Sequence, residues 1–231
     1  MEDIRKFERE NTVSAEKQVS EVIIRSEQEG NPKVLFVGNS ITLHGVKPDI
    51  GWHWLWGMAA SAKEKDYVHQ TMHMVREIAP DAGYMIMQAA DWERGFWKGP
   101  EAFDNLRIAR EYDADILVFR IGENVLDKDM KEYDLSAAFE KLIGFLNPSG
   151  KAQVIVTDMF WPNPEKDACA KRAAQKTSSR FVSINHLGTM DEMKALGLFE
   201  HTGVAAHPGD LGMLKIAEAV FEAMKPVLKG E

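Results

Sequence analysis

Five short apolar runs, separated by longer segments of helical periodicity, constrain this 231-residue chain more than any other feature of its sequence. Such an alternation is typical of a parallel sheet covered by helices on both faces, because strands buried on both sides are apolar throughout. The runs predict strands over residues 33–37, 84–88, 116–121, 153–158 and 180–184. The segments between and after them predict helices over residues 64–78, 100–112, 134–146, 165–177 and 208–225. The fold class is therefore α/β, with a five-stranded parallel sheet.

The first 30 residues differ from the rest of the chain. They are polar, have one stretch of helical periodicity over residues 15–25, and end at Gly30, Asn31 and Pro32. We interpret residues 1–30 as an N-terminal helical extension and residues 31–231 as one domain, because no repeat or linker divides the remainder.

Charge and composition exclude several classes of partner. The formal net charge of −8 argues against nucleic acid, since phosphate binding needs a concentrated basic face. The apolar runs are far shorter than the roughly 20 residues that cross a bilayer, and the charged N-terminus does not resemble a secretory signal, so we expect no membrane partner and a cytoplasmic location. Cys169 is the single cysteine, so no intrachain disulfide and no cysteine-based metal site is expected.

Ser40 lies directly after the first predicted strand, in the segment KVLFVGNSITLHG. Functional groups of open parallel sheets gather at the carboxyl ends of strands, so this serine is well placed for chemistry. A serine hydroxyl becomes a strong nucleophile only when a base takes its proton. The alternative is a turn in which Gly38 supplies a permissive backbone and Ser40 caps the next segment.

Two further residues occupy comparable positions. His207 precedes the last predicted helix in a loop, where an imidazole can serve as a proton acceptor. Asn124 follows the middle strand, where a side-chain amide can donate to an oxyanion. Each also has an ordinary structural explanation, as a cap or a turn residue. The other six histidines have no comparable setting: His44, His53, His69, His73, His186 and His201.

Taken together, the three segments resemble the SGNH (GDSL-like) hydrolase superfamily in order and spacing, from about residue 33 to residue 225. In that family the blocks read Gly-Asp-Ser, Gly-x-Asn-Asp and Asp-x-x-His. The resemblance implies that Ser40 is the nucleophile, Asn124 an oxyanion donor beside the Ser40 amide, and His207 the base. It also implies a flavodoxin-like three-layer α/β/α sandwich that hydrolyses esters through an acyl-enzyme, without a metal or an organic cofactor.

The chain departs from the family pattern at several positions. Asn39 replaces the first-block aspartate, Val125 replaces the aspartate after Asn124, and Val204 stands where the family has the triad acid. A backbone carbonyl near Val204 is one possible partner for the second ring nitrogen of His207, and three carboxylates are the others: Glu200, Asp210 and Glu123.

In the second block, alignment places Glu93 at the position of the family's oxyanion glycine, with Gly95 two residues further on. The oxyanion donor that the family's second block supplies is therefore left unassigned.

Five of the six tryptophans fall in two segments that follow predicted strands, GWHWLWGM and ADWERGFW. Aromatic rings can pack against sugar faces or form an acyl pocket, and neighbouring charged groups can hydrogen-bond hydroxyls or an acidic group. The alternative is that the rings pack a long loop onto the body. The predicted substrate-binding residues are Trp52, Trp54, Trp56, Trp92, Glu93, Arg94 and Trp97.

These residues predict an esterase that removes a short acyl group, acetyl by family analogy, from a carbohydrate or another small molecule. Two alternatives remain open at the level of sequence. One is a lipid esterase or thioesterase, and the other is a catalytically weak protein of the same fold that binds a glycan or small ligand.

Overall fold

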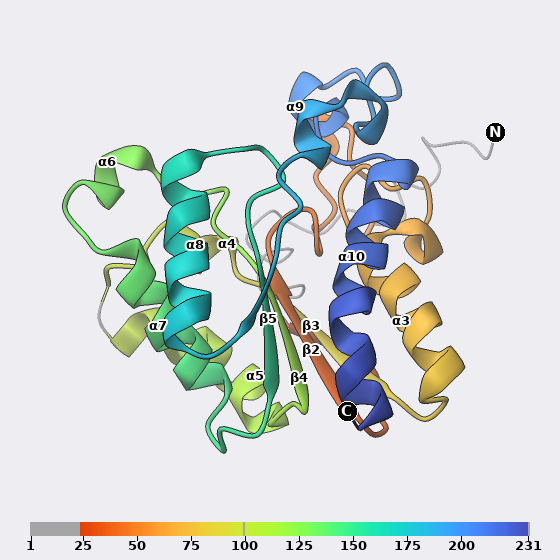
Figure 1. The fold of residues 1–231 in the computed structure, drawn as a ribbon. Helices are drawn as coiled ribbons and strands as arrows, with labels where there is room; N and C mark the ends of the chain where they lie inside the picture. Colours follow the sequence, from red (N-terminus) through yellow and green to blue (C-terminus); the bar gives the residue numbers. More distant parts are fainter. Residues whose placement is uncertain (1–23, 99, 231) are drawn as a thin grey trace.

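The computed structural model describes residues 24–98 and 100–230, which form a six-stranded sheet with helices on both faces (Figure 1). The strand order is β1-β3-β2-β4-β5-β6. Strands β2 to β6 are parallel, whereas β1 pairs antiparallel with β3. The strand bounds are β1 Ile24–Gln28, β2 Lys33–Gly38, β3 Gly83–Gln88, β4 Ile116–Arg120, β5 Gln153–Thr157 and β6 Arg180–Val182.

All five predicted strands are confirmed, but the sheet has a sixth. Strand β1, with the sequence IRSEQ, was missed because an edge strand contacts a neighbour on one side only and needs no continuous apolar run. Its residues fall inside the segment that the sequence assigns to the extension. The helix predicted over residues 15–25 lies outside the described residues except for its last two, which belong to β1.

The helices occupy the predicted segments with three differences. The segment 64–78 is split by Asp66, which caps α3 by accepting the His69 N–H at 2.8 Å. The segment 100–112 is a 3₁₀ helix followed by the short helix α5, and the last helix begins at Asp210 and continues to Lys229. The α-helices are α3 Tyr67–Ile78, α4 Ala90–Glu93, α5 Arg107–Tyr112, α6 Asp127–Met130, α7 Leu135–Leu146, α8 Pro164–Lys176, α9 Thr202–Ala205 and α10 Asp210–Lys229. The 3₁₀ helices are η1 Pro48–Ile50, η2 Lys63–Lys65, η3 Pro100–Leu106, η4 Leu187–Thr189 and η5 Asp191–Met193.

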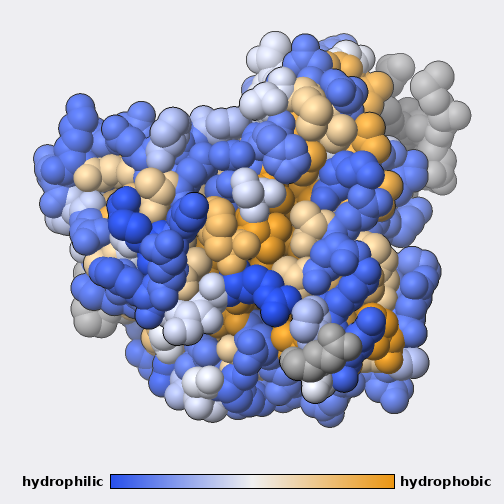
Figure 2. Space-filling view, viewed as in Figure 1, coloured by the Kyte–Doolittle hydropathy of each residue, from blue (hydrophilic) through white to orange (hydrophobic). Residues whose placement is uncertain are grey.

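Two apolar cores lie on opposite faces of the sheet. Helices α3 and α10 cover one face, and α5, α7 and α8 cover the other (Figure 1). Strand β2 shows the alternation: Val34 and Phe36 belong to the first core, and Leu35 and Val37 belong to the second. Figure 2 shows polar outer surfaces on the helices and apolar atoms in the middle of the same view. Within the described ranges, none of the helices combines the length and the apolar character needed to cross a bilayer.

The strand order places a switch point at the carboxyl end of β2. This strand lies between β3 and β4, so the chain leaves it toward one side of the sheet and later returns on the other side. In open α/β sheets, ligands bind in the crevice at such a point. Ser40 follows β2 by two residues and therefore lies where this topology favours a site.

Candidate active site

Ser40 and His207 meet at the carboxyl edge of the sheet. The Ser40 Oγ lies 2.8 Å from the His207 Nε2, although the two residues are 167 positions apart in the sequence. The turn that carries Ser40 is held by the Asn39 carbonyl, which accepts the backbone N–H groups of Thr42 and Leu43. Gly38 is required at the strand end because a Cβ there would lie 1.8 Å from the Thr42 hydroxyl oxygen.

The hydrogen-bond partner of the second ring nitrogen of His207 determines which tautomer is present. Its Nδ1 lies 2.7 Å from the Gly203 carbonyl oxygen, in the turn formed by α9. Because a carbonyl oxygen only accepts, Nδ1 carries the hydrogen and Nε2 carries the lone pair. The Ser40 hydroxyl therefore donates to Nε2, which is the arrangement that a general base requires. The rings of Trp161 and His207 pack nearly perpendicular to each other, with centroids 4.9 Å apart.

Among the alternatives that the sequence left open for His207, a backbone carbonyl is the one that the structure places beside its Nδ1, and the three carboxylates have other surroundings. The Asp210 carboxylate binds Ser61 and Lys65 at the start of α10. Glu123 binds Arg120, and Glu200 is exposed on the surface.

Burial lowers the pKa of His207 to about 4. The contact with the Gly203 carbonyl opposes this shift, while the nearby His44 and Arg120 add to it. The imidazole is therefore neutral at neutral pH and available to accept a proton.

A buried polar network lies beneath this pair. Arg120, which is fully buried, donates to the Asn39 side-chain oxygen and to Glu123, the latter at 2.5 Å. The Asn39 amide donates to Glu123 at 2.6 Å and to Glu93 at 3.0 Å. Glu93 also accepts from the Asn124 Nδ2 at 2.5 Å. The network connects the Ser40 turn, helix α4 and the loop after β4.

A cavity of about 200 Å³ opens over Ser40. It is lined by Ser40, His44, Ile50, Met58, Gln88, Ala90, Arg94, Asn124, His201, Gly203, Val204 and His207. The structure thus brings together four residues that the sequence singled out, namely Ser40, Arg94, Asn124 and His207. His44 and His201, which the sequence did not single out, also line this cavity.

Helix α4, which follows β3, contributes its first residue, Ala90, to this cavity. The Ala90 N–H donates to the side-chain oxygen of Gln88 at 3.0 Å. Glu93, which alignment placed at the family's glycine, is fully buried instead, and Gly95 is not among the lining residues.

The tryptophans of the first predicted segment pack a loop rather than line the cavity. Trp52 is fully buried, and its ring lies 5.0 Å from that of Trp54 and 6.0 Å from that of Trp56. It also packs against Phe199 at 6.1 Å, in an apolar cluster that contains the fully buried Val204. We name these five residues the tryptophan cluster. It joins the Ser40 loop to the segment that carries His207, as the loop-packing alternative predicts.

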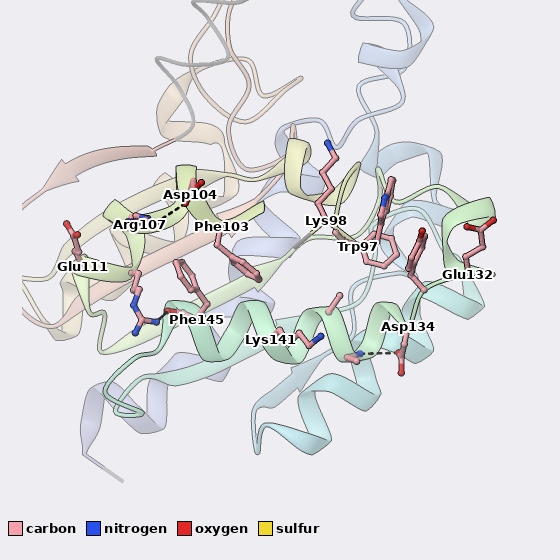
Figure 3. Close-up of a pocket in the computed structure, with 15 residues that line it drawn as sticks. Trp97, Lys98, Phe103, Asp104, Arg107, Glu111, Glu132, Asp134, Lys141 and Phe145 are labelled. Carbon is pink, nitrogen blue, oxygen red and sulfur yellow. Dashed lines mark hydrogen bonds and ion pairs between the residues drawn. The ribbon is translucent and has the colours of Figure 1, made fainter. Parts of the chain in front are cut away.

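The other predicted substrate-binding residues, apart from Arg94, do not line the cavity over Ser40 either. Trp92 is buried against Phe139, and Glu93 is buried in the polar network. Trp97 lines a second, larger cavity of about 890 Å³ between η3, α5 and α7 (Figure 3). Its ring stacks on that of Tyr133, with centroids 5.5 Å apart. This cavity contains neither Ser40 nor His207.

Among residues 24–98 and 100–230, no three His, Cys, Asp or Glu side chains are grouped so that they would hold a metal ion. Two residues of the site were beyond sequence reasoning. Gly203 acts through its backbone oxygen, which leaves no signature in a sequence, and Arg120 reads as part of an apolar strand.

Comparisons with known proteins agree with this architecture. No protein-family model and no curated protein matches the sequence. An acetyl xylan esterase from Geobacillus stearothermophilus aligns over 85% of this chain and 96% of its own, with 19% identity and a TM-score of 0.52. A protein from Parabacteroides merdae described as a GDSL-like lipase aligns over 86% and 98%, with 14% identity and a TM-score of 0.52. The chain has the SGNH hydrolase fold.

A third similar structure is that of a carbohydrate esterase. A family two carbohydrate esterase from Clostridium thermocellum, in complex with cellohexaose, aligns over 87% of this chain and 66% of its own. The identity is 14% and the TM-score 0.54. At these identities, the likeness establishes the fold.

Proposed function

We propose that this chain is a serine esterase that hydrolyses short acyl esters, with carbohydrate esters as the preferred class. The observation that carries the proposal is the 2.8 Å contact between the Ser40 hydroxyl and the lone-pair nitrogen of His207. A hydroxyl paired with a neutral imidazole, at the mouth of a cavity, is the arrangement that nucleophilic acyl transfer needs.

In this mechanism, His207 Nε2 takes the Ser40 proton as Oγ attacks the ester carbonyl carbon. The resulting oxyanion accepts hydrogen bonds from the Ser40 N–H and from the Asn124 amide. The intermediate collapses, the alcohol leaves with the proton from His207, and water then attacks the acyl-serine with the same base. The Gly203 carbonyl orients the imidazole and stabilises its charged form with a dipole instead of a full negative charge.

The size of the cavity supports a short acyl group. At about 200 Å³ it is below the roughly 300–1,000 Å³ of sites that enclose drug-sized ligands. Ile50, Met58 and Val204 supply apolar lining, while Arg94 and His44 supply polar groups for the alcohol part. The comparison structures include an acetyl xylan esterase and an esterase active on acetylated mannans, which favours acetylated sugars as the substrate class.

The test is a series of p-nitrophenyl esters. We expect kcat/KM to fall at least about tenfold from acetate to octanoate, because each methylene that the cavity cannot accommodate costs on the order of 1–3 kcal/mol. Ser40→Ala, checked for folding by circular dichroism, is the control and should hydrolyse each ester at least about 10⁴-fold more slowly. A wild-type rate in Ser40→Ala would refute the mechanism, and a preference for octanoate would favour the lipid esterase.

The pH profile is a second test. Since the depressed pKa of His207 keeps its base form populated in mild acid, we expect kcat/KM for the acetate ester to stay level down to about pH 5. It should halve near the pKa of about 4 and fall tenfold per pH unit below it. Circular dichroism at each pH separates this titration from acid unfolding. A midpoint at the unperturbed histidine value of about 6.5 would contradict the assignment.

A further inference from the structure

Glu93 is the one carboxylate that directly contacts Asn124, the candidate oxyanion donor, within the described residues. Its side chain is fully buried on α4. One oxygen accepts from the Gly122 N–H at 2.5 Å, from the Asn39 Nδ2 at 3.0 Å and from the Asn124 N–H at 3.4 Å. The other accepts from the Asn124 Nδ2 at 2.5 Å. Four N–H groups from two separate loops therefore converge on one carboxylate.

This set of contacts fits an acceptor and nothing else. All four neighbouring atoms are N–H donors, so an amide in this place would set one N–H group against another. Burial raises the pKa of Glu93 and the neighbouring Glu123 raises it further, whereas the hydrogen bonds from Asn124, Asn39 and Gly122 oppose this shift. A buried carboxylate is costly, and here its partners are groups of the candidate site.

The geometry at Asn124 gives this carboxylate a role. A primary amide has two hydrogens, and Glu93 accepts one of them, which fixes the plane of the group. Asn124 itself lines the cavity over Ser40. The loop is held as well, because Gly122, at φ +141°, begins the turn and donates its N–H to the same carboxylate.

We propose that Glu93 is a positioning residue that holds the Asn124 amide with its second hydrogen directed into the cavity, ready for the oxyanion. This role rests on the esterase function proposed above. Glu93 also accepts a hydrogen bond from Asn39, the neighbour of Ser40, and so links the Ser40 turn to the loop that carries Asn124. Glu93 acts through these groups and does not touch the substrate.

The decisive variant is Glu93→Gln, which keeps the shape and replaces one acceptor oxygen with a donor. We expect kcat for p-nitrophenyl acetate to fall between about 10- and 10³-fold with little change in KM, as when an oxyanion donor is removed. Asn124→Ala should fall by a similar or larger factor. When Asn124 is already replaced by alanine, adding Glu93→Gln should lower kcat by a further factor of less than about three, because both changes remove the same interaction.

A thionoester substrate provides a readout that a purely structural role would not change. Sulfur accepts hydrogen bonds weakly, so the ratio of ester to thionoester rates reports the strength of the oxyanion donors. We expect this ratio to fall in Glu93→Gln as it does in Asn124→Ala. An unchanged ratio, or effects of the two substitutions that simply multiply, would overturn the proposal.

The matched control is Asp115→Asn, a carboxylate-to-amide change at the opposite edge of the sheet, where Asp115 accepts the Lys33 N–H at 2.8 Å. This variant should lose stability while the rate ratio of ester to thionoester stays at the wild-type value.

Side-chain amide NMR tests whether Glu93 holds Asn124 without depending on esterase activity. In the wild type the Asn124 Nδ2 hydrogens should give two resonances with slow exchange, and in Glu93→Gln this protection should be lost. If the wild type hydrolyses no ester, the esterase function fails, and the NMR comparison still decides whether Glu93 holds Asn124.

Discussion

His207→Ala is expected to lower kcat/KM for p-nitrophenyl acetate at least about 10⁴-fold, and Ser40→Ala by a similar factor. The reason is the single hydrogen bond of 2.8 Å through which the imidazole activates the hydroxyl. Since the two side chains act as one unit, the double variant should be no less active than either single variant. Steady-state kinetics on the three purified proteins measure this directly.

The control for this prediction is His186→Ala, which removes an exposed histidine outside the cavity and should leave the rate unchanged. A fluorophosphonate probe adds an independent readout. It should label Ser40 rapidly in the wild type and slowly in His207→Ala. If His207→Ala retained the wild-type rate, another group would be the base; if the folded wild type were not labelled, the binding-protein alternative would gain support.

Val204→Asp is expected to lower the free energy of unfolding by about 3–5 kcal/mol without raising kcat. The substitution restores the residue type of the family's triad acid, but Val204 is fully buried in the tryptophan cluster. A carboxylate there loses its hydration among apolar rings, and the Nδ1 of His207 is already bonded to Gly203. Chemical denaturation and steady-state kinetics test the two parts.

Val204→Ala separates the effect of charge from the effect of volume. It should cost about 1–3 kcal/mol, as expected for a small cavity in a core, and should leave the protein active. The difference between the two variants is then the cost of the buried charge. A rise in kcat for Val204→Asp would show instead that the carboxylate reaches His207, and would contradict the role that the structure gives to the Gly203 carbonyl.

The fold was predictable from the sequence where burial on both faces of a strand requires an unbroken run of apolar residues. Strands β2 and β4 are buried on both faces, so runs such as Val34 to Val37 were recognisable. Strand β1 was not, because an edge strand needs partners only along one side, and those partners are more than 50 residues away in β3. The order of the strands also depends on crossovers that leave no local pattern.

The candidate site was predictable where it rests on residues beside strand and helix ends. Ser40, Asn124 and His207 each lie beside such an end, but only the resemblance of the three segments to one family singled them out. The structure places all three around one cavity. The orienting partner was not identifiable, since any residue supplies a carbonyl. Glu93 was misjudged for a related reason, because the network that buries it comes from positions 39 and 120–124.

The tryptophan cluster has a consequence for how activity arises during folding. It joins residues 52–56 to residues 199–204, and the Ser40–His207 contact spans almost the same distance along the chain. Contacts so remote in sequence form late, because the entropy of closing the long loop must be overcome first. Ester hydrolysis should therefore return more slowly than helical structure after dilution from denaturant. Its return then reports when the segment that carries His207 packs against the Ser40 loop.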